Sequence, residues 1–63
     1  MKIEELSNKE LYEIYSYYFM ERLPKGAKIS KMAHGTSNHE VTCIYTKDNK
    51  QYFTSEIIPE RLR

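Results

Sequence analysis

The stretch LSNKELYEIYSYYFM, residues 6–20, decides the fold because it combines two helix-start signals with most of the chain's aromatic surface. Ser7 is a good helix N-cap, and Glu10 follows it at the spacing of a capping box. Leu6 precedes the cap and Leu11 falls at the fourth helical position, which is the spacing of a hydrophobic staple. These independent signals agree, so a helix is predicted to start directly after the cap.

The end of this helix is indicated by residues that interrupt helical structure. Pro24 and Gly26 follow the apolar pattern within a few positions, and such residues commonly terminate helices. The sequence therefore predicts a helix from Asn8 to about Arg22 or Leu23.

On a wheel of 100° per residue, the apolar side of this helix covers roughly half the circumference, more than the ~100° of an ordinary surface helix. The members of this wide stripe are Leu11, Tyr12, Ile14, Tyr15, Tyr18, Phe19 and Leu23. Tyr17 and Met20 fall outside it, among polar residues that mark the solvent side. The fold has no obvious need of these two side chains.

Three segments after residue 27 have strand character, because they are rich in β-branched or aromatic residues and are separated by turn residues. The expected strands are KISKMAH (28–34), HEVTCIYT (39–46) and QYFTSEII (51–58), with turns at GTSN (35–38) and KDNK (47–50) and an end at Pro59.

Two registers can be drawn for the second hairpin. A two-residue loop, Asp48-Asn49, places Tyr45 beside Tyr52. A three-residue loop, 47–49, pairs Cys43 with Phe53 and Ile44 with Tyr52, which separates polar from apolar side chains better and is the register we predict. One face would then carry Val41, Cys43, Tyr45, Phe53 and Ile57, and the other Thr42, Ile44, Thr46, Tyr52, Thr54 and Glu56.

The predicted fold class is therefore α+β, with one N-terminal amphipathic helix packed on a three-stranded antiparallel β-meander. At 63 residues the chain is expected to form a single small domain, 1–63. One helix can cover only one face of such a sheet, so the face with the threonines, Ile44 and Tyr52 must meet water or a partner. The tail PERLR, 59–63, is expected to fray or to dock along the sheet edge.

Composition favours an intracellular protein. The chain has one cysteine, Cys43, so it cannot form the internal disulfides on which small secreted domains usually depend. Neither a signal-peptide pattern nor a membrane-length apolar run is apparent. We therefore expect a cytoplasmic protein without a membrane association, and a homodimer because small unstapled chains often oligomerise.

The sequence offers little for metal or cofactor binding. His34, His39 and Cys43 are the only soft or borderline ligands. His39 and Cys43 are four positions apart and would project from the same strand face, but zinc needs at least a third ligand. We predict no metal and no cofactor.

Catalysis is not expected either. Cys43 lies in mid-strand on the predicted core face, where a thiol is usually inert. His39 would lie roughly 13 Å away along a strand that rises about 3.3 Å per residue, too far for a Cys–His pair. The carboxylates do not converge on a cleft, and so small a fold has little room for a substrate pocket. The prediction is a protein that is not an enzyme and takes no small-molecule substrate.

Charge is unevenly distributed and leaves nucleic-acid binding open as the alternative function. Residues 1–23 carry a net charge of −2 and residues 24–63 a net charge of +3, within a total of +1. Tyr52 could offer a stacking surface among the lysines of the sheet half, although a net +3 makes a weak field. The candidate nucleic-acid contacts are Lys28, Lys31, Lys47 and Lys50.

The leading hypothesis is a small interaction module that acts stoichiometrically as an inhibitor, adaptor or regulator. Tyr17 and Met20 are its predicted anchors, with Tyr52 and Ile44 as secondary contacts, because tyrosine and methionine are enriched at interface cores. The partner is another protein or a second copy of the chain. In its small size and low cysteine content the chain is similar to accessory proteins of phages and mobile elements, a resemblance that implies blockage of a host protein.

Overall fold

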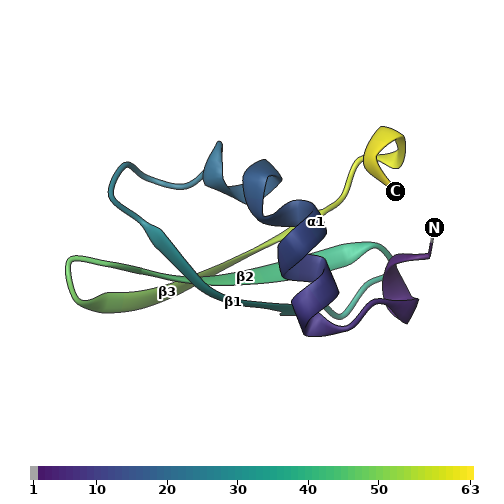
Figure 1. The fold of residues 1–63 in the computed structure, drawn as a ribbon, viewed down its shortest axis with the longest axis horizontal. Coiled ribbons are helices and arrows are strands. Elements are labelled where there is room, and N and C mark those ends of the chain that lie inside the picture. Colours follow the sequence, from purple (N-terminus) through teal and green to yellow (C-terminus); the bar gives the residue numbers. More distant parts are fainter. Residues whose placement is uncertain (1) are drawn as a thin grey trace.

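The structure, a computed structural model, describes residues 2–63 and confirms the predicted α+β fold (Figure 1). Its helix is followed by an open antiparallel sheet with the strand order β1-β2-β3. The elements in chain order are the 3-10 helix η1 (Ile3–Glu5), α1 (Asn8–Met20), β1 (Lys28–His34), β2 (Glu40–Lys47), β3 (Lys50–Ile57) and the 3-10 helix η2 (Glu60–Leu62).

The capping box at the start of α1 is present. Ser7 Oγ accepts a hydrogen bond from the Glu10 backbone N–H at 3.1 Å, and Glu10 Oε1 accepts one from the Ser7 N–H at 2.9 Å. Two helix donors that would otherwise lack partners are thereby satisfied. The hydrogen bond from the Ser7 backbone also holds the pKa of Glu10 below its usual value. The helix begins at Asn8, as predicted.

The regular helix ends at Met20, earlier than predicted. Both Arg22 and Leu23 direct their backbone N–H groups at the Phe19 carbonyl, at 2.8 and 3.0 Å. This shared acceptor tightens the last turn and closes the helix before Pro24. Gly26 then adopts a φ of 89°, in the left-handed region that glycine tolerates without strain.

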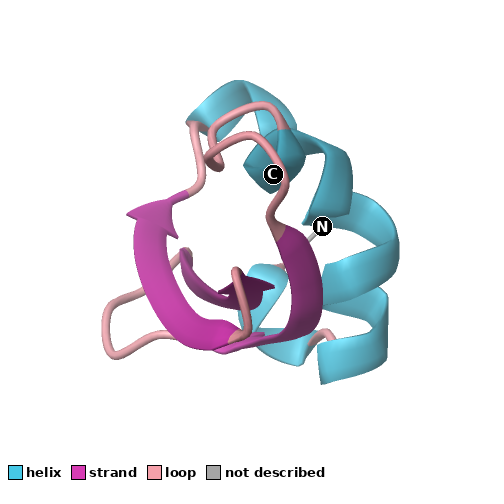
Figure 2. Ribbon diagram, turned by 90° about the vertical axis from the view of Figure 1, so that its left-hand side faces the viewer, coloured by secondary structure: helices cyan, strands magenta, loops and turns pink. Residues whose placement is uncertain are grey.

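The helix α1 lies on the concave side of the curved sheet (Figure 2), and the core cluster joins side chains from both. Successive turns of α1 bury Leu11, Tyr15 and Phe19, the spacing that puts side chains on one helix face. The completely or almost completely buried side chains are Ile3, Leu11, Tyr15, Phe19, Met32, Val41, Cys43 and Ile58. The helix covers one end of the sheet only, and the β2–β3 hairpin extends beyond it (Figure 1).

The predicted register of that hairpin is wrong. The loop has two residues, Asp48 and Asn49, so that Tyr45 lies opposite Tyr52. Both loop residues have positive φ, 53° and 63°, as a type I′ turn requires, and its twist matches that of the flanking strands. Turn geometry therefore determined the pairing, and the separation of polar from apolar side chains did not.

The corrected register reassigns the faces of β3. Phe53 and Ile57, predicted to face the core, lie on the open face and are 75% and 51% exposed. Tyr52, predicted on the open face beside Ile44, lies instead on the helix side. The core position near the end of β3 belongs to Ile58, whose N–H donates to the His39 carbonyl at 2.9 Å.

The C-terminal tail is docked against α1. The Tyr15 hydroxyl, 47 positions away in sequence, donates to the Leu62 carbonyl at 3.0 Å. Arg63 Nε donates to the Ile58 carbonyl at 2.9 Å and closes the turn that contains η2. The expectation that this tail frays or follows the sheet edge is therefore replaced by a contact with the helix.

Candidate protein-interaction surface

The outer side of α1 carries the most exposed aromatic ring of the described residues. Tyr17 is 82% exposed and Met20 is 48% exposed. Tyr17 stands two positions from both Tyr15 and Phe19, and two residues correspond to about 200° around a helix. Burying those two neighbours therefore turns Tyr17 away from the sheet.

Tyr17 forms a ridge between two shallow depressions. One depression lies toward Tyr12 and Met20 and continues onto the start of β1 at Lys28 and Ile29. The other lies toward the docked tail and is bordered by Ile14, Tyr18 and Leu62 among others. We refer to Tyr12, Tyr17 and Met20 together as the outer helix patch.

Acidic side chains flank this patch along the helix. Glu13 and Glu21 lie one turn before and one turn after Tyr17, and both are exposed. Residues four apart on a helix are neighbours on its surface. The Tyr17 ring is thus an apolar ridge between two acidic side chains along the helix, and the depressions beside it are also bordered by Arg22, Arg61 and Lys28.

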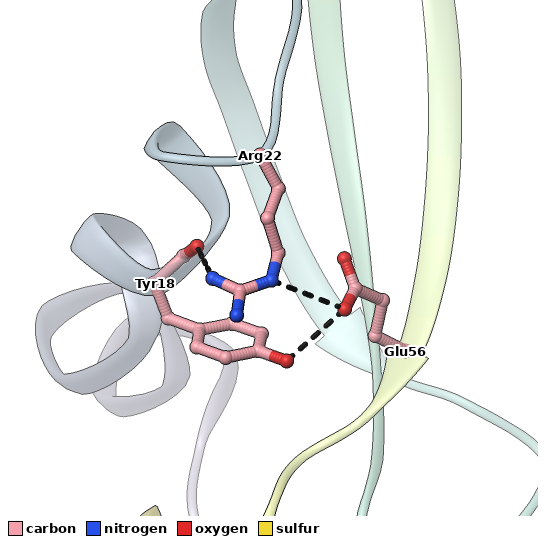
Figure 3. Close-up of polar contacts among 3 residues, drawn as sticks. All are labelled: Tyr18, Arg22 and Glu56. Carbon is pink, nitrogen blue, oxygen red and sulfur yellow. Dashed lines mark hydrogen bonds and ion pairs between the residues drawn. The ribbon is translucent and has the colours of Figure 1, made fainter.

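A cluster of polar contacts fixes the C-terminal end of α1 to the sheet (Figure 3). Arg22 lies over the Tyr18 ring at 3.7 Å from its centroid, and its Nη1 donates to the Tyr18 carbonyl at 2.9 Å. Glu56 Oε1 accepts from the Tyr18 hydroxyl at 3.1 Å and lies 3.6 Å from Arg22 Nε. Burial and the hydrogen bond to Glu56 raise the pKa of Tyr18. These contacts hold the helix, and the patch on it, at a defined orientation to β3.

The secondary contacts predicted on the sheet do not join the outer helix patch. Ile44 lies on the open face, directly opposite Phe53 in the adjacent strand. Tyr52 stacks on Tyr45 on the helix side, with ring centroids 5.5 Å apart and planes at 23°. The two residues therefore belong to different surfaces. Phe53 is the exposed ring that sequence reasoning missed, and the Asp48-Asn49 pair was the signal for the register that exposes it.

Three of the four predicted nucleic-acid contacts gather at the hairpin tip. Lys28, Lys47 and Lys50 border one depression, together with Asp48. Lys31 is separate from them, since it pairs with Ile44 in the adjacent strand and so shares the open face. The basic side chains thus form a local group at the tip and do not extend as a stripe along the sheet.

The candidate metal-ligating residues are dispersed. His34 Nε2 donates to the Leu6 carbonyl at 2.7 Å, and His39, with a φ of 65°, precedes β2 and does not extend it. Cys43 is fully buried, and this burial raises the pKa of its thiol. Within residues 2–63, no three or more His, Cys, Asp or Glu side chains are grouped to hold a metal ion.

Among the described helices, none has the length and apolar character needed to cross a membrane. Comparison with known proteins finds no matching family model, no matching curated protein and no matching solved structure.

Proposed function

We propose that this protein is a non-catalytic interaction module that acts stoichiometrically by inserting the Tyr17 ring, with Met20 beside it, into a pocket of a larger protein. The observation that carries the proposal is that Tyr17 is 82% exposed, whereas the residues on the inner face of the same helix are buried in the core. The fold is complete without this ring. A rigid aromatic side chain on a helix is also an effective anchor, because it loses little conformational entropy on binding.

The surroundings of Tyr17 support one kind of partner. The acidic residues Glu13 and Glu21 on either side favour an apolar pocket rimmed by Lys or Arg, since complementary charge speeds encounter and fixes orientation. The contact between Arg22 and Glu56 supports a docking surface that is already ordered before binding, which lowers the entropic cost of association. Bound in this way, the protein would inhibit or regulate its partner by steric occlusion of the pocket.

A cytoplasmic role as a phage or mobile-element accessory protein that blocks a host protein is part of this proposal. The unpaired, buried thiol of Cys43 supports a reducing compartment. Its burial also supports the absence of thiol catalysis, because the thiolate is the reactive form and burial raises its pKa.

Photo-crosslinking from the helix tests the proposal. A photoreactive phenylalanine analogue replaces Tyr17 in one variant and the exposed Lys9, near the helix start, in a control. In cells that naturally contain the protein, we expect the variant at position 17 to form one discrete adduct that the control does not form. The adducted protein is then purified and titrated with the wild-type chain and with Tyr17→Gln. Adducts that are identical at both positions, or equal affinities in the titration, would contradict the proposal.

A second candidate function, nucleic-acid binding, is favoured by one observation. Lys28, Lys47 and Lys50 meet at the hairpin tip, close to the stacked rings of Tyr45 and Tyr52. Lysines beside an aromatic platform are typical of single-strand binding sites. Fluorescence anisotropy with random-sequence DNA and RNA at low salt tests it. Binding should weaken steeply as salt rises and should be reduced in Lys47→Gln/Lys50→Gln; an absence of binding at micromolar protein would exclude it.

A further inference from the structure

The two edges of the sheet differ in how well they are protected against pairing with another strand. On β1 the register shifts between Ile29 and Lys31, so that Ser30 has no paired residue. This strand also carries two exposed lysines and makes the most extensive contact with α1. Bulges and lysines are the usual means by which proteins block an edge strand. The β1 edge is therefore closed to a further strand.

The β3 edge has no bulge, and its one lysine, Lys50, stands at the hairpin end. Its pairing with β2 runs without interruption from Lys50 to Ile57, and the strand contains no proline. Most of its residues are exposed. A long, regular and accessible edge strand presents a row of unpaired N–H and C=O groups to which another strand can add.

The hydrogen bond at the end of β3 shows which backbone groups point outward. Ile58 directs its N–H toward β2, at the His39 carbonyl. In an antiparallel pair, residues at alternate positions direct both backbone groups to the same side. The even-numbered residues of β3 therefore bond to β2, and the groups at the free edge belong to Gln51, Phe53, Ser55 and Ile57.

We propose that this edge binds the β3 strand of a second copy of the chain, in antiparallel orientation, with the two-fold axis at Phe53. The two sheets then become one continuous sheet. Phe53 pairs with Phe53 of the partner subunit, and Gln51 pairs with Ser55 of the partner subunit on each side of the axis. All of these residues have outward-facing backbone groups, so the register makes about six new backbone hydrogen bonds.

Charge complementarity favours the register centred on Phe53 over a register shifted by one residue. Centred on Phe53, the pairing sets Lys50 opposite Glu56 of the partner subunit, and the symmetry repeats this pair. Glu56 makes its contacts with Tyr18 and Arg22 through Oε1, and its side chain remains 31% exposed. Centring the axis on Thr54 would instead set Tyr52 opposite the carboxylate. Opposite charges across a strand pair are favourable.

The same register joins the apolar residues of the two open faces. Phe53 is 75% exposed in the single chain, and its ring would meet its own symmetry mate, with Ile44 behind each ring in β2. A strand pair of this size buries less than about 1,200 Å² in total, the range of weak and transient complexes. Association is therefore expected at micromolar to millimolar concentrations and uses no residue of the outer helix patch.

Cysteine crosslinking tests the position of the axis. In Phe53→Cys the two new thiols lie on the axis, with Cα atoms about 5.5 Å apart, within the range that a disulfide spans. In the control Gln51→Cys the corresponding Cα atoms are four positions out of register, which separates them by about 14 Å when the rise along the strand and the spacing across the pair are combined. We expect mild oxidation to give a covalent dimer of the first variant, at least tenfold faster than of the second. The buried Cys43 is common to both. Equal rates would overturn the proposal.

Sedimentation equilibrium up to about 1 mM tests the association itself, and the expected weak affinity sets that range. The wild-type chain should dimerise reversibly. Phe53→Lys places two positive charges together at the axis and should raise the dissociation constant at least tenfold, whereas Tyr17→Lys should leave it unchanged. A wild-type chain that is monomeric throughout would overturn the proposal and leave the edge to a strand from another protein. Loss of the dimer only in Tyr17→Lys would assign association to the outer helix patch and would also overturn it.

Discussion

Tyr15 and Tyr17 lie on the same helix two positions apart, and the structure uses them in opposite ways. Tyr15 is 2% exposed, and its hydroxyl donates to the Leu62 carbonyl of the docked tail. Tyr17 is 82% exposed, and its ring lies in the solvent between two acidic residues. The residue type is identical, so its position relative to the helical period decides between a core role and a surface role.

This difference shows how so short a chain can complete a core and still leave large side chains exposed. The inner stripe of α1 reaches the core through Leu11, Tyr15 and Phe19, one from each turn. Because the next elements of the chain complete that core, the outer face is free to carry large side chains that the fold does not require. The large side chains exposed there are Tyr12, Ile14, Tyr17 and Met20.

The largest effect is expected from Tyr15→Ala. Removing a fully packed aromatic side chain costs about 3–5 kcal/mol of unfolding free energy, most of the stability that a domain of this size commonly has. The variant should be largely unfolded at 37 °C by circular dichroism, whereas Tyr17→Ala should melt close to the wild type. Equal losses in the two variants would remove the distinction between the two tyrosines.

A smaller effect is expected when only the hydroxyl is removed. Tyr15→Phe keeps the ring but deletes the hydrogen bond to Leu62, so the unfolding free energy should fall by about 1 kcal/mol in a urea titration. Hydrogen exchange in residues 60–63 should speed up as well, because this bond holds the tail on α1. Tyr17→Phe is the matched control and should change neither quantity. An unchanged tail in Tyr15→Phe would show that the hydroxyl is dispensable.

Mild acid should lower the unfolding free energy through two carboxylates that lie outside the core. Hydrogen bonds from the Ser7 and Ser37 backbones, respectively, hold the pKa values of Glu10 and Glu40 below the ordinary 4.5. Since the unfolded chain then binds more protons, stability should be complete above about pH 4.5 and should fall as pH drops through the lower native pKa values. Urea titrations from pH 6 to pH 3 measure this slope. Glu10→Gln should reduce the slope, and an unchanged slope would show that the capping carboxylate carries none of it.

The start of α1 and the strand order could be predicted because their signals are local. Ser7 and Glu10 are three residues apart, and the structure shows both of their reciprocal hydrogen bonds. The strand segments were similarly marked by composition and by the turns between them. Information of this kind is contained within a few consecutive residues, so it does not depend on the rest of the fold.

The hairpin register depended on more than polarity, and the prediction from polarity was wrong. Asp48 and Asn49 both adopt positive φ, and this turn geometry brings Tyr52 to the helix side and Phe53 to the open face. The buried positions of Ile58, Met32 and Ile3 were likewise missed. All three join a core cluster whose members come from distant parts of the chain, so no local pattern marked them.

The exposure of the candidate site followed from helical period alone, because Tyr17 is about 200° from its buried neighbours. The separation of Tyr52 from Ile44 could not be predicted without the register. The unprotected β3 edge also required the structure, since it depends on which strand lies outermost and which strand α1 packs on.

The central claim is that the fold does not need the outer face of α1 for its stability. The unfolding free energy of the double variant Tyr17→Gln/Met20→Gln tests this claim most directly. Glutamine has at least as high a helix propensity as the tyrosine it replaces and one close to that of methionine, so the substitution removes apolar surface without disturbing the helix. We predict a loss below about 1 kcal/mol, because surface substitutions rarely cost more. A loss of about 3 kcal/mol, comparable to that of Tyr15→Ala, would show that both sides of the helix hold the fold together and that no surface remains for a partner.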